Sequence, residues 1–304
     1  VHVVVLNLLG STLFLVAVGC IYSAAGSLNL ADLAERAAAL PQDREGLWRA
    51  GAWLLVVVFA LKAALLPLGF WLPSAYSAAD GTVAALFAIL TKVGVVSILR
   101  TGTLLFGDVG LEPVVQVLAV ATLVLGAIGM MAARRLSQMA AYAVVLSVGT
   151  LLIAVSLSTR AGVTAAVYYL MQGTVAAAGL FLIAERLGLL RGDPADRLVP
   201  AGEIRGRLAL PLAFLVTAVA IAGLPPLGGF IAKVALLEAA AEAGKAGWVF
   251  PAILVTSLLA IVALARAGSL LFWNAASAVG RDEAPQRLVG AAASALGIGT
   301  LVLG

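Results

Sequence analysis

The chain has 304 residues, of which 63% are hydrophobic and only 11% are charged, and its mean hydropathy is +1.12. No soluble core of this size could hide so much apolar surface, so the composition excludes a soluble protein and indicates an integral membrane protein. The net charge of +4 does not indicate nucleic-acid binding, because the arginines are scattered over short loops without interleaved aromatic residues. Cys20 is the only cysteine, which excludes a disulfide framework and a thiolate metal site.

Apolar runs of about 20 residues predict a single transmembrane domain over residues 1–304, with eight full spans and part of a ninth. Long unbroken Leu, Val and Ala runs favour an all-α helix bundle over barrel strands, which would alternate over about 10 residues. We expect the natural protein to extend beyond both ends, with further helices before Val1 and more chain after Gly304. The predicted spans are residues 3–26, 52–71, 82–106, 113–133, 139–158, 162–184, 208–237, 248–272 and 289 onward.

Two stretches between the predicted spans are polar. Residues 29–49 carry acids and bases in near balance, and the apolar spacing in LNLADLAERAAAL predicts a short amphipathic helix on the membrane surface. Residues 185–207 contain five arginines and two prolines and are predicted to form a solvated connector.

Basic residues in the loops predict the orientation, because cytoplasmic loops carry an excess of Lys and Arg. Loops on one side of the predicted membrane hold nine basic residues, and loops on the other side hold six. The first side, which includes Arg134 and Arg135, is therefore expected to be cytoplasmic. The second span would then run toward the cytoplasm and the seventh away from it.

The second predicted span contains both a lysine and a break. In VFALKAALLPLGFWLPSAY, residues 58–76, Lys62 lies inside the apolar run and Pro67 follows it. A lysine near the bilayer centre costs about 3 kcal/mol, which indicates a functional use. Pro67 lacks an N–H group and crowds the carbonyl of Ala63, so it frees backbone groups that must face protein or water.

The seventh predicted span contains a similar interruption, GLPPLGG, followed by Lys233. Two broken helices of opposite direction, each with a lysine, predict an inverted repeat with a transport site near the membrane midplane. Beyond these breaks the two halves show no strong residue-level repeat. The break residues of the seventh span are Pro225, Pro226, Gly228 and Gly229.

Lys62, Lys92 and Lys233 are the candidate stations of an ion pathway. Lys92 lies about ten residues into the third span, too far from either end for easy snorkelling. Each lysine could instead be a structural cation that pairs with a carbonyl at a helix break or reaches an interface. We favour function, because a buried ammonium group can gain and lose a proton near neutral pH, whereas a guanidinium cannot.

The acids are absent from the centre of the spans. All 15 Asp and Glu residues fall in loops or near span ends, so a counter-carboxylate for the lysines would come from a missing segment or a partner subunit. Tyr142 and Gln172 are further pathway candidates, because their side chains could hold water or protons. Each could equally join two helices, as hydroxyls and amides often do in membranes. No redox or nucleotide-binding motif is present, and we expect no cofactor, metal site or catalytic residue.

Over nearly the whole chain, these motifs resemble the antiporter-like membrane subunits that Mrp-type sodium/proton antiporters share with respiratory complex I. KAALLPL with FWLP resembles the family's lysine-bearing broken helix, LTKVG its next helix, and AGLPPLGGF ending in Lys233 its second broken helix. Lys233, the NLADL segment and the absence of histidine from the first motif are most similar to the Mrp D subunit. Many relatives have histidines where this chain has Gly69, Tyr76 and Gln172, so water held by Tyr and Gln side chains would bridge the lysines.

The resemblance implies a proton-translocating subunit of a multisubunit Na+/H+ antiporter in the bacterial plasma membrane, assembled with other membrane subunits. Lys62 would pair with a glutamate on a preceding helix, Lys92 would connect, and Lys233 would be the terminal exchanger. It implies no enzymatic activity and no nucleic-acid partner. Two alternatives stay open. One is a proton-pumping subunit of a complex I type NADH:quinone oxidoreductase. The other is a scaffold whose lysines hold neighbouring subunits through their acids.

Overall fold

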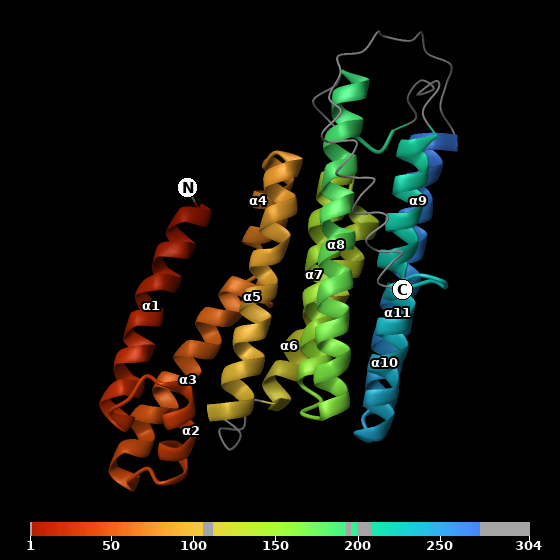
Figure 1. The fold of residues 1–304 in the computed structure, drawn as a ribbon. Coiled ribbons are helices and arrows are strands. Elements are labelled where there is room, and N and C mark those ends of the chain that lie inside the picture. The colour runs from red at the N-terminus through yellow and green to blue at the C-terminus, as the bar shows by residue number, and fades with distance from the viewer. Residues whose placement is uncertain (1, 106–111, 193–195, 200–207, 274–304) are drawn as a thin grey trace.

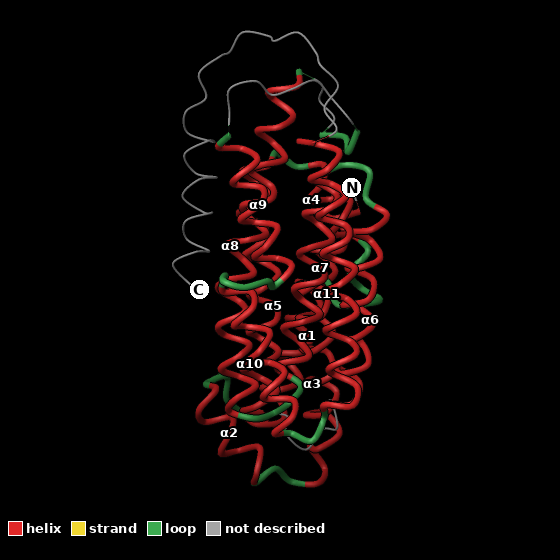
Figure 2. Tube along the Cα trace, turned by 90° about the vertical axis from the view of Figure 1, so that its right-hand side faces the viewer, coloured by secondary structure: helices red, strands yellow, loops and turns green. Residues whose placement is uncertain are grey.

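The computed structural model describes residues 2–105, 112–192, 196–199 and 208–273. Its helices lie roughly parallel and form an elongated bundle, with α1 (His2–Ala25) at one side and α11 (Ala246–Gly268) at the other (Figure 1). Figure 2 turns the bundle by a quarter and shows a narrower stack. Seven of the described helices are long and apolar enough to cross a membrane. The prediction of an all-α, multi-pass membrane bundle is confirmed.

The predicted amphipathic helix is α2 (Leu30–Ala38), which lies at the end of the bundle below α1 (Figure 1). The side chain of Asn29 caps it by accepting a hydrogen bond from the N–H of Ala31 at 3.0 Å. The guanidinium of Arg36 donates to Asp32 at 2.7 Å, and this bond, followed by one from Ser27, holds the pKa of Asp32 below its usual value.

The second span begins earlier than predicted. Helix α3 (Gln42–Ala63) starts well before residue 52, because Asp43 and Glu45 lie in its first turn, where carboxylates favour a helix start. After a break, α4 (Trp71–Ala78) continues upward, and α5 (Gly81–Leu105) returns downward beside it (Figure 1).

Helices α6 (Glu112–Ala132) and α7 (Leu136–Val155) form the most extensive helix pair of the bundle. In the apolar stretch of α7, 83% of the residues are buried inside the bundle, whereas in that of α1 only 17% are buried. Helix α7 is therefore central and α1 peripheral. Two glycines allow the close approach. A Cβ on Gly126 would lie 2.5 Å from the backbone nitrogen of Leu146, and a Cβ on Gly149 would lie 2.5 Å from that of Leu123.

Helix α8 (Arg160–Arg191) is longer than the predicted span of residues 162–184, and it ends at Gly192, whose φ of +61° favours glycine as a C-terminal cap. The prediction of a solvated connector from residue 185 is therefore wrong in its first part. It is also wrong at Asp196, which is 5% exposed. Asp196 accepts hydrogen bonds from the backbone N–H of Ser137 and from the guanidinium of Arg135, so it caps the start of α7.

The seventh span is split into α9 (Ala209–Ala222) and α10 (Gly228–Glu242), and α11 continues into a short π-helix, Ser269–Trp273. Figure 1 shows α9 above α10, with the break about half-way along the bundle. The chain runs upward through α3 and α4 and downward through α9 and α10, so the predicted opposition of the two broken helices is confirmed. The predicted ninth span lies outside the described residues.

Candidate functional site

The first helix break has a defined hydrogen-bonded geometry. Ala64, directly after α3, takes a left-handed conformation with φ of +59°. The N–H of the next residue, Leu65, then donates back to the carbonyl of Ala60 at 2.9 Å. This is the Schellman arrangement, which satisfies carbonyls at a helix end. Pro67 follows in the turn between α3 and α4, as predicted.

The second break repeats this geometry. Gly223, with φ of +74°, follows α9, and the N–H of Leu224 donates back to Val219 at 3.1 Å. The segments ALLPLGF at 64–70 and GLPPLGG at 223–229 therefore correspond residue by residue, including Pro67 with Pro226. The sequence predicted that the two breaks form a pair but not this residue-level correspondence, and the lysines of the two copies are not equivalent. Lys62 precedes its break and Lys233 follows its own.

The glycines of the second break allow a tight crossing of α9 and α10. A Cβ on Gly229 would lie 2.0 Å from the carbonyl oxygen of Ala220, so no larger residue fits without a shift of the backbone. Gly228 precedes it as the buried first residue of α10. Pro225 and Pro226 are exposed in the turn. The predicted break residues thus lie where the chain changes from α9 to α10.

Lys62 lies near the end of α3 and faces α1. Its ammonium group donates to the side-chain oxygen of Asn7 at 2.7 Å. The amide nitrogen of Asn7 donates in turn to the carbonyl of Val3 at 2.9 Å, which fixes the oxygen toward the lysine. Asn7 was missed at the level of sequence, although a lone amide inside an apolar span is a signal that could have found it.

Lys92 is the largest of the fully enclosed side chains, with 2% of its surface exposed. Its ammonium group, on α5, donates to the hydroxyl of Ser147 on α7. The Ser147 hydroxyl donates to the carbonyl of Val144 at 2.9 Å, so its lone pairs are free to face the lysine. A neutral oxygen on the central helix therefore holds this cation.

Lys233 reaches back from α10 to the end of α9. Its ammonium group donates to the carbonyl of Ala222 at 2.7 Å, to that of Ile221 at 3.4 Å and to the hydroxyl of Ser257 on α11 at 2.8 Å. The side chain is buried, with 7% exposed. Ser257 was missed as well, because nothing in the sequence shows which face of α11 meets the break.

Gln172 lies at the same break as Lys233. Its amide nitrogen, on α8, donates to the carbonyl of Ala220 at 3.1 Å, and the side chain is 2% exposed. Tyr142 lies elsewhere, with its ring on α7 packed against Gly129 of α6, where a Cβ would be 2.1 Å from the ring. The structure thus brings Gln172 to a lysine site and places Tyr142 in the contact between α6 and α7.

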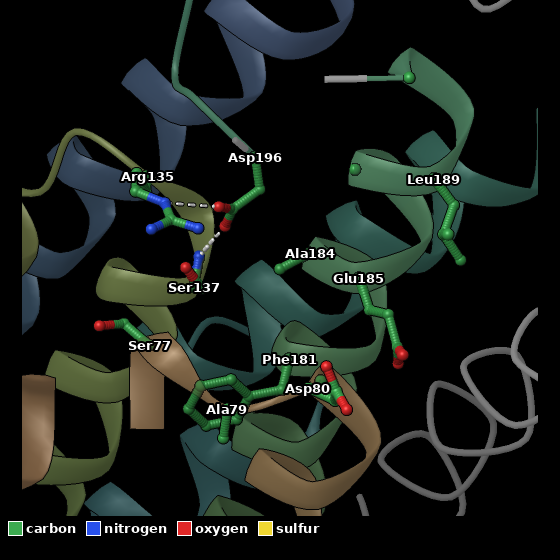
Figure 3. A pocket seen from close by; sticks show the side chains of 13 residues that line it. Ser77, Ala79, Asp80, Arg135, Ser137, Phe181, Ala184, Glu185, Leu189 and Asp196 are labelled. Atoms are coloured by element: carbon green, nitrogen blue, oxygen red, sulfur yellow. Dashed lines mark hydrogen bonds and ion pairs between the residues drawn. The ribbon is translucent and has the colours of Figure 1, made fainter. Parts of the chain in front are cut away.

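A cavity of about 480 Å³ with several charged side chains in its lining opens where α4 meets α5 (Figure 3). Its lining includes Asp80, Glu185 and the ion pair between Arg135 and Asp196, whose atoms lie 2.8 Å apart. The hydroxyl of Thr82 donates to Glu185 at 3.0 Å. From the sequence these acids were expected only as loop and span-end residues, and a shared cavity was not predicted.

The three lysines lie on α3, α5 and α10, which stand in that order from one side of the bundle to the other, with α8 in contact with both α5 and α10 (Figure 1). Each ammonium group is bound by neutral oxygens in the hydrogen bonds of the described residues. Such a row can hold protons at separate stations within an apolar bundle.

Comparison with known proteins identifies the family of the chain. The family model described as "NADH:quinone oxidoreductase/Mrp antiporter, TM" matches residues 1–260. A probable K+/H+ antiporter D subunit of Rhizobium meliloti is 38% identical over 307 residues, which cover 90% of this chain and 57% of the relative. A Na+/H+ antiporter D subunit of Bacillus subtilis is 34% identical over 274 residues, which cover 89% of this chain and 55% of the relative.

Among solved structures, a chain of the Mrp complex from Dietzia sp. DQ12-45-1b matches with a TM-score of 0.84 and 26% identity. That match covers 99% of this chain and 63% of the other. The chain thus spans just over half the length of the relatives named above. Since the family model covers most of the sequence, the chain belongs to the NADH:quinone oxidoreductase/Mrp antiporter transmembrane family.

Proposed function

We propose that this chain is the proton-translocating part of a D-type subunit in a multisubunit monovalent cation/proton antiporter. The observation that carries the proposal is the row of three lysines inside the spans, each held by neutral oxygens and two of them beside helix breaks of opposite direction. The names of the relatives support it, since one is the D subunit of a K+/H+ antiporter and the other that of a Na+/H+ antiporter.

In the proposed mechanism, protons pass along the membrane plane from one lysine to the next. A proton on one ammonium group disfavours a proton on its neighbour, because like charges repel strongly in a medium of low dielectric constant. Gln172 sits beside the Lys233 station and would hold the break in position. Water would bridge the distances between stations, with Tyr142 as a further candidate to hold it.

The chain would act with other membrane subunits in the bacterial plasma membrane, as a transporter and without enzymatic chemistry. Na+ is the exchanged ion in one named relative and K+ in the other, so we include both. The positive-inside count would place the loop at Arg134 and Arg135 in the cytoplasm.

A second candidate is a proton-pumping subunit of a complex I type NADH:quinone oxidoreductase, which the family description also covers. The same helices would then be driven by electron transfer. Co-purification with iron–sulfur and flavin subunits would favour this candidate. Co-purification with small membrane subunits alone would favour the antiporter.

The antiporter proposal is tested by cation/proton exchange in membrane vesicles that contain the complete complex. Lys62→Ala should abolish exchange, and Lys62→Arg should do the same, because a guanidinium does not release its proton. Lys245→Ala is the matched control, since Lys245 lies outside the spans and pairs with Glu112. Exchange that survives in both Lys62 variants would overturn the proposal.

A further inference from the structure

The end of α9 at the second break satisfies all four of its terminal carbonyls with groups of the protein. The last four carbonyls of a helix have no partner within it, and at membrane depth they must find one in the protein. The carbonyl of Val219 accepts from two backbone N–H groups, and that of Ala220 accepts from Gln172. The remaining two, Ile221 and Ala222, accept from the ammonium group of Lys233.

The ammonium nitrogen thus occupies a small cage of oxygens. Two helix-end carbonyls and the hydroxyl of Ser257 surround it at 2.7, 3.4 and 2.8 Å. All three ligands are neutral, and the carbonyls lie at the negative end of the α9 dipole. Carbonyls at the ends of broken membrane helices are also the ligands that coordinate Na+ in transporters, and rings of carbonyls replace the hydration shell of K+ in channels.

Gly223 leaves the room for this cation. A Cβ at that position would lie 2.6 Å from Cδ and 2.9 Å from Nζ of Lys233, so the lysine side chain lies directly on the glycine. The first break is built differently. The carbonyl of Leu61, near the end of α3, accepts from the indole N–H of Trp71 at 3.2 Å, and Lys62 binds Asn7 on another helix.

We propose that the carbonyls of Ile221 and Ala222 and the hydroxyl of Ser257 form a binding site for a monovalent alkali cation, Na+ or K+. The ammonium group of Lys233 and the alkali cation occupy this site in alternation. The inference rests on the proposed function, in which Lys233 releases protons.

The exchange balances in charge. When the N–H bond of the ammonium breaks, the proton passes to water in the pathway, and the neutral amine leaves the cage. An alkali cation enters in its place, so one positive charge leaves and one arrives. The two carbonyls, which accept from no backbone N–H group of the described residues, then keep a partner throughout. This would couple proton release to cation binding at a single point of the chain.

The test measures cation-dependent stability of the complete purified complex in NaCl, in KCl and in N-methylglucamine chloride at equal ionic strength. Lys233→Ala empties the cage of its ammonium group, so the variant should be stabilised by Na+ or K+ and not by N-methylglucamine. At ten times the dissociation constant, the ratio of folded to unfolded protein should rise about 11-fold. Lys233→Ala with Ser257→Ala should respond much less.

Lys92→Ala is the matched control, because it also removes a buried lysine. The site that it vacates offers the hydroxyl of Ser147 but no helix-end carbonyls, so it should not bind an alkali cation. An absent response in Lys233→Ala, or an equal response in Lys92→Ala, would overturn the inference.

A second measurement uses the wild-type complex, so it tests the inference even if the Lys233→Ala complex does not assemble. Addition of NaCl or KCl to the weakly buffered wild-type complex should release protons, while N-methylglucamine chloride should release none. No release would also overturn it. Both readouts are independent of transport, so they can fail while the lysine relay holds.

Discussion

At the scale of single residues, the lysines inside the spans donate hydrogen bonds to neutral groups of the protein. These are an amide for Lys62, a hydroxyl for Lys92, and carbonyls with a hydroxyl for Lys233. Neutral oxygens stabilise an ammonium group without cancelling its charge. Loss of the proton therefore leaves behind no unpaired buried carboxylate, which would be costly. Lysines held in this way suit a pathway in which each side chain repeatedly binds and releases a proton.

Ser147→Ala tests the station at Lys92. The variant removes the hydroxyl that accepts from the ammonium group, and a buried charged donor without a partner costs about 1–3 kcal/mol or more. We expect exchange in vesicles to slow about tenfold and its pH profile to shift, with recovery in Ser147→Thr. Ser97→Ala is the control, because that hydroxyl bonds a carbonyl of its own helix. An unchanged rate and pH profile in Ser147→Ala would contradict the assignment.

The sequence predicted three buried cations but not what holds them, and the structure buries Lys92 and Lys233 while Lys62 is only partly buried. A lysine in an apolar run is visible from local composition alone. Its partner depends on how two helices are rotated against each other, and no local pattern shows that rotation. Ser257 was missed for this reason, whereas Asn7 carried a local signal as a lone amide in an apolar span. Tyr142 was predicted from its type alone, and the structure places its ring against Gly129.

At the scale of elements, the contact between α6 and α7 depends on glycines that face backbone atoms. A Cβ on Gly126 would lie 2.5 Å from the nitrogen and 2.6 Å from Cα of Leu146. Backbone cannot rotate away as a side chain can. Gly126→Ala should therefore push the two helices apart and lower the free energy of unfolding by about 1–3 kcal/mol. Thermal unfolding of the complex in detergent measures this change.

Gly19→Ala is the matched control within a helix, because a Cβ there meets nothing within 4 Å. This variant should be neutral or more stable by up to about 1 kcal/mol, since alanine favours helix. If Gly126→Ala and Gly19→Ala lowered the free energy of unfolding equally, the close packing of α6 on α7 would not explain the destabilisation by Gly126→Ala.

The elements themselves were largely predictable, and the exceptions have physical reasons. Both breaks were predicted, because proline and glycine interrupt helices through local geometry. The length of α8 was not, because hydropathy marks where a helix leaves the apolar layer and not where its hydrogen bonds end. The burial of Asp196 was also missed, since it depends on a tertiary contact with the start of α7.

At the scale of the whole molecule, the direction of the bundle across the membrane follows from loop charge and can be measured. Arg134 and Ser158 are exposed near opposite ends of α7. In a background with Cys20→Ser, an impermeant thiol reagent should modify Ser158→Cys in intact cells. It should modify Arg134→Cys only in inverted vesicles. The opposite pattern would reverse the orientation proposed from the basic residues.

The row of lysines also predicts how their effects combine. Stations in series form one path, so removal of a second station should cost little once the first is gone. Independent roles in packing or assembly would instead give effects that add.

The most direct test measures cation/proton exchange in vesicles with the complete complex for Lys62→Ala, Lys92→Ala, Lys233→Ala and their pairs. Immunoblots would confirm equal assembly, and Lys245→Ala would serve as the control outside the spans. A shared path predicts that each single variant loses nearly all exchange and that no pair is appreciably worse. Exchange that persists in any single variant, or losses that multiply in the pairs, would contradict a single path through the three lysines.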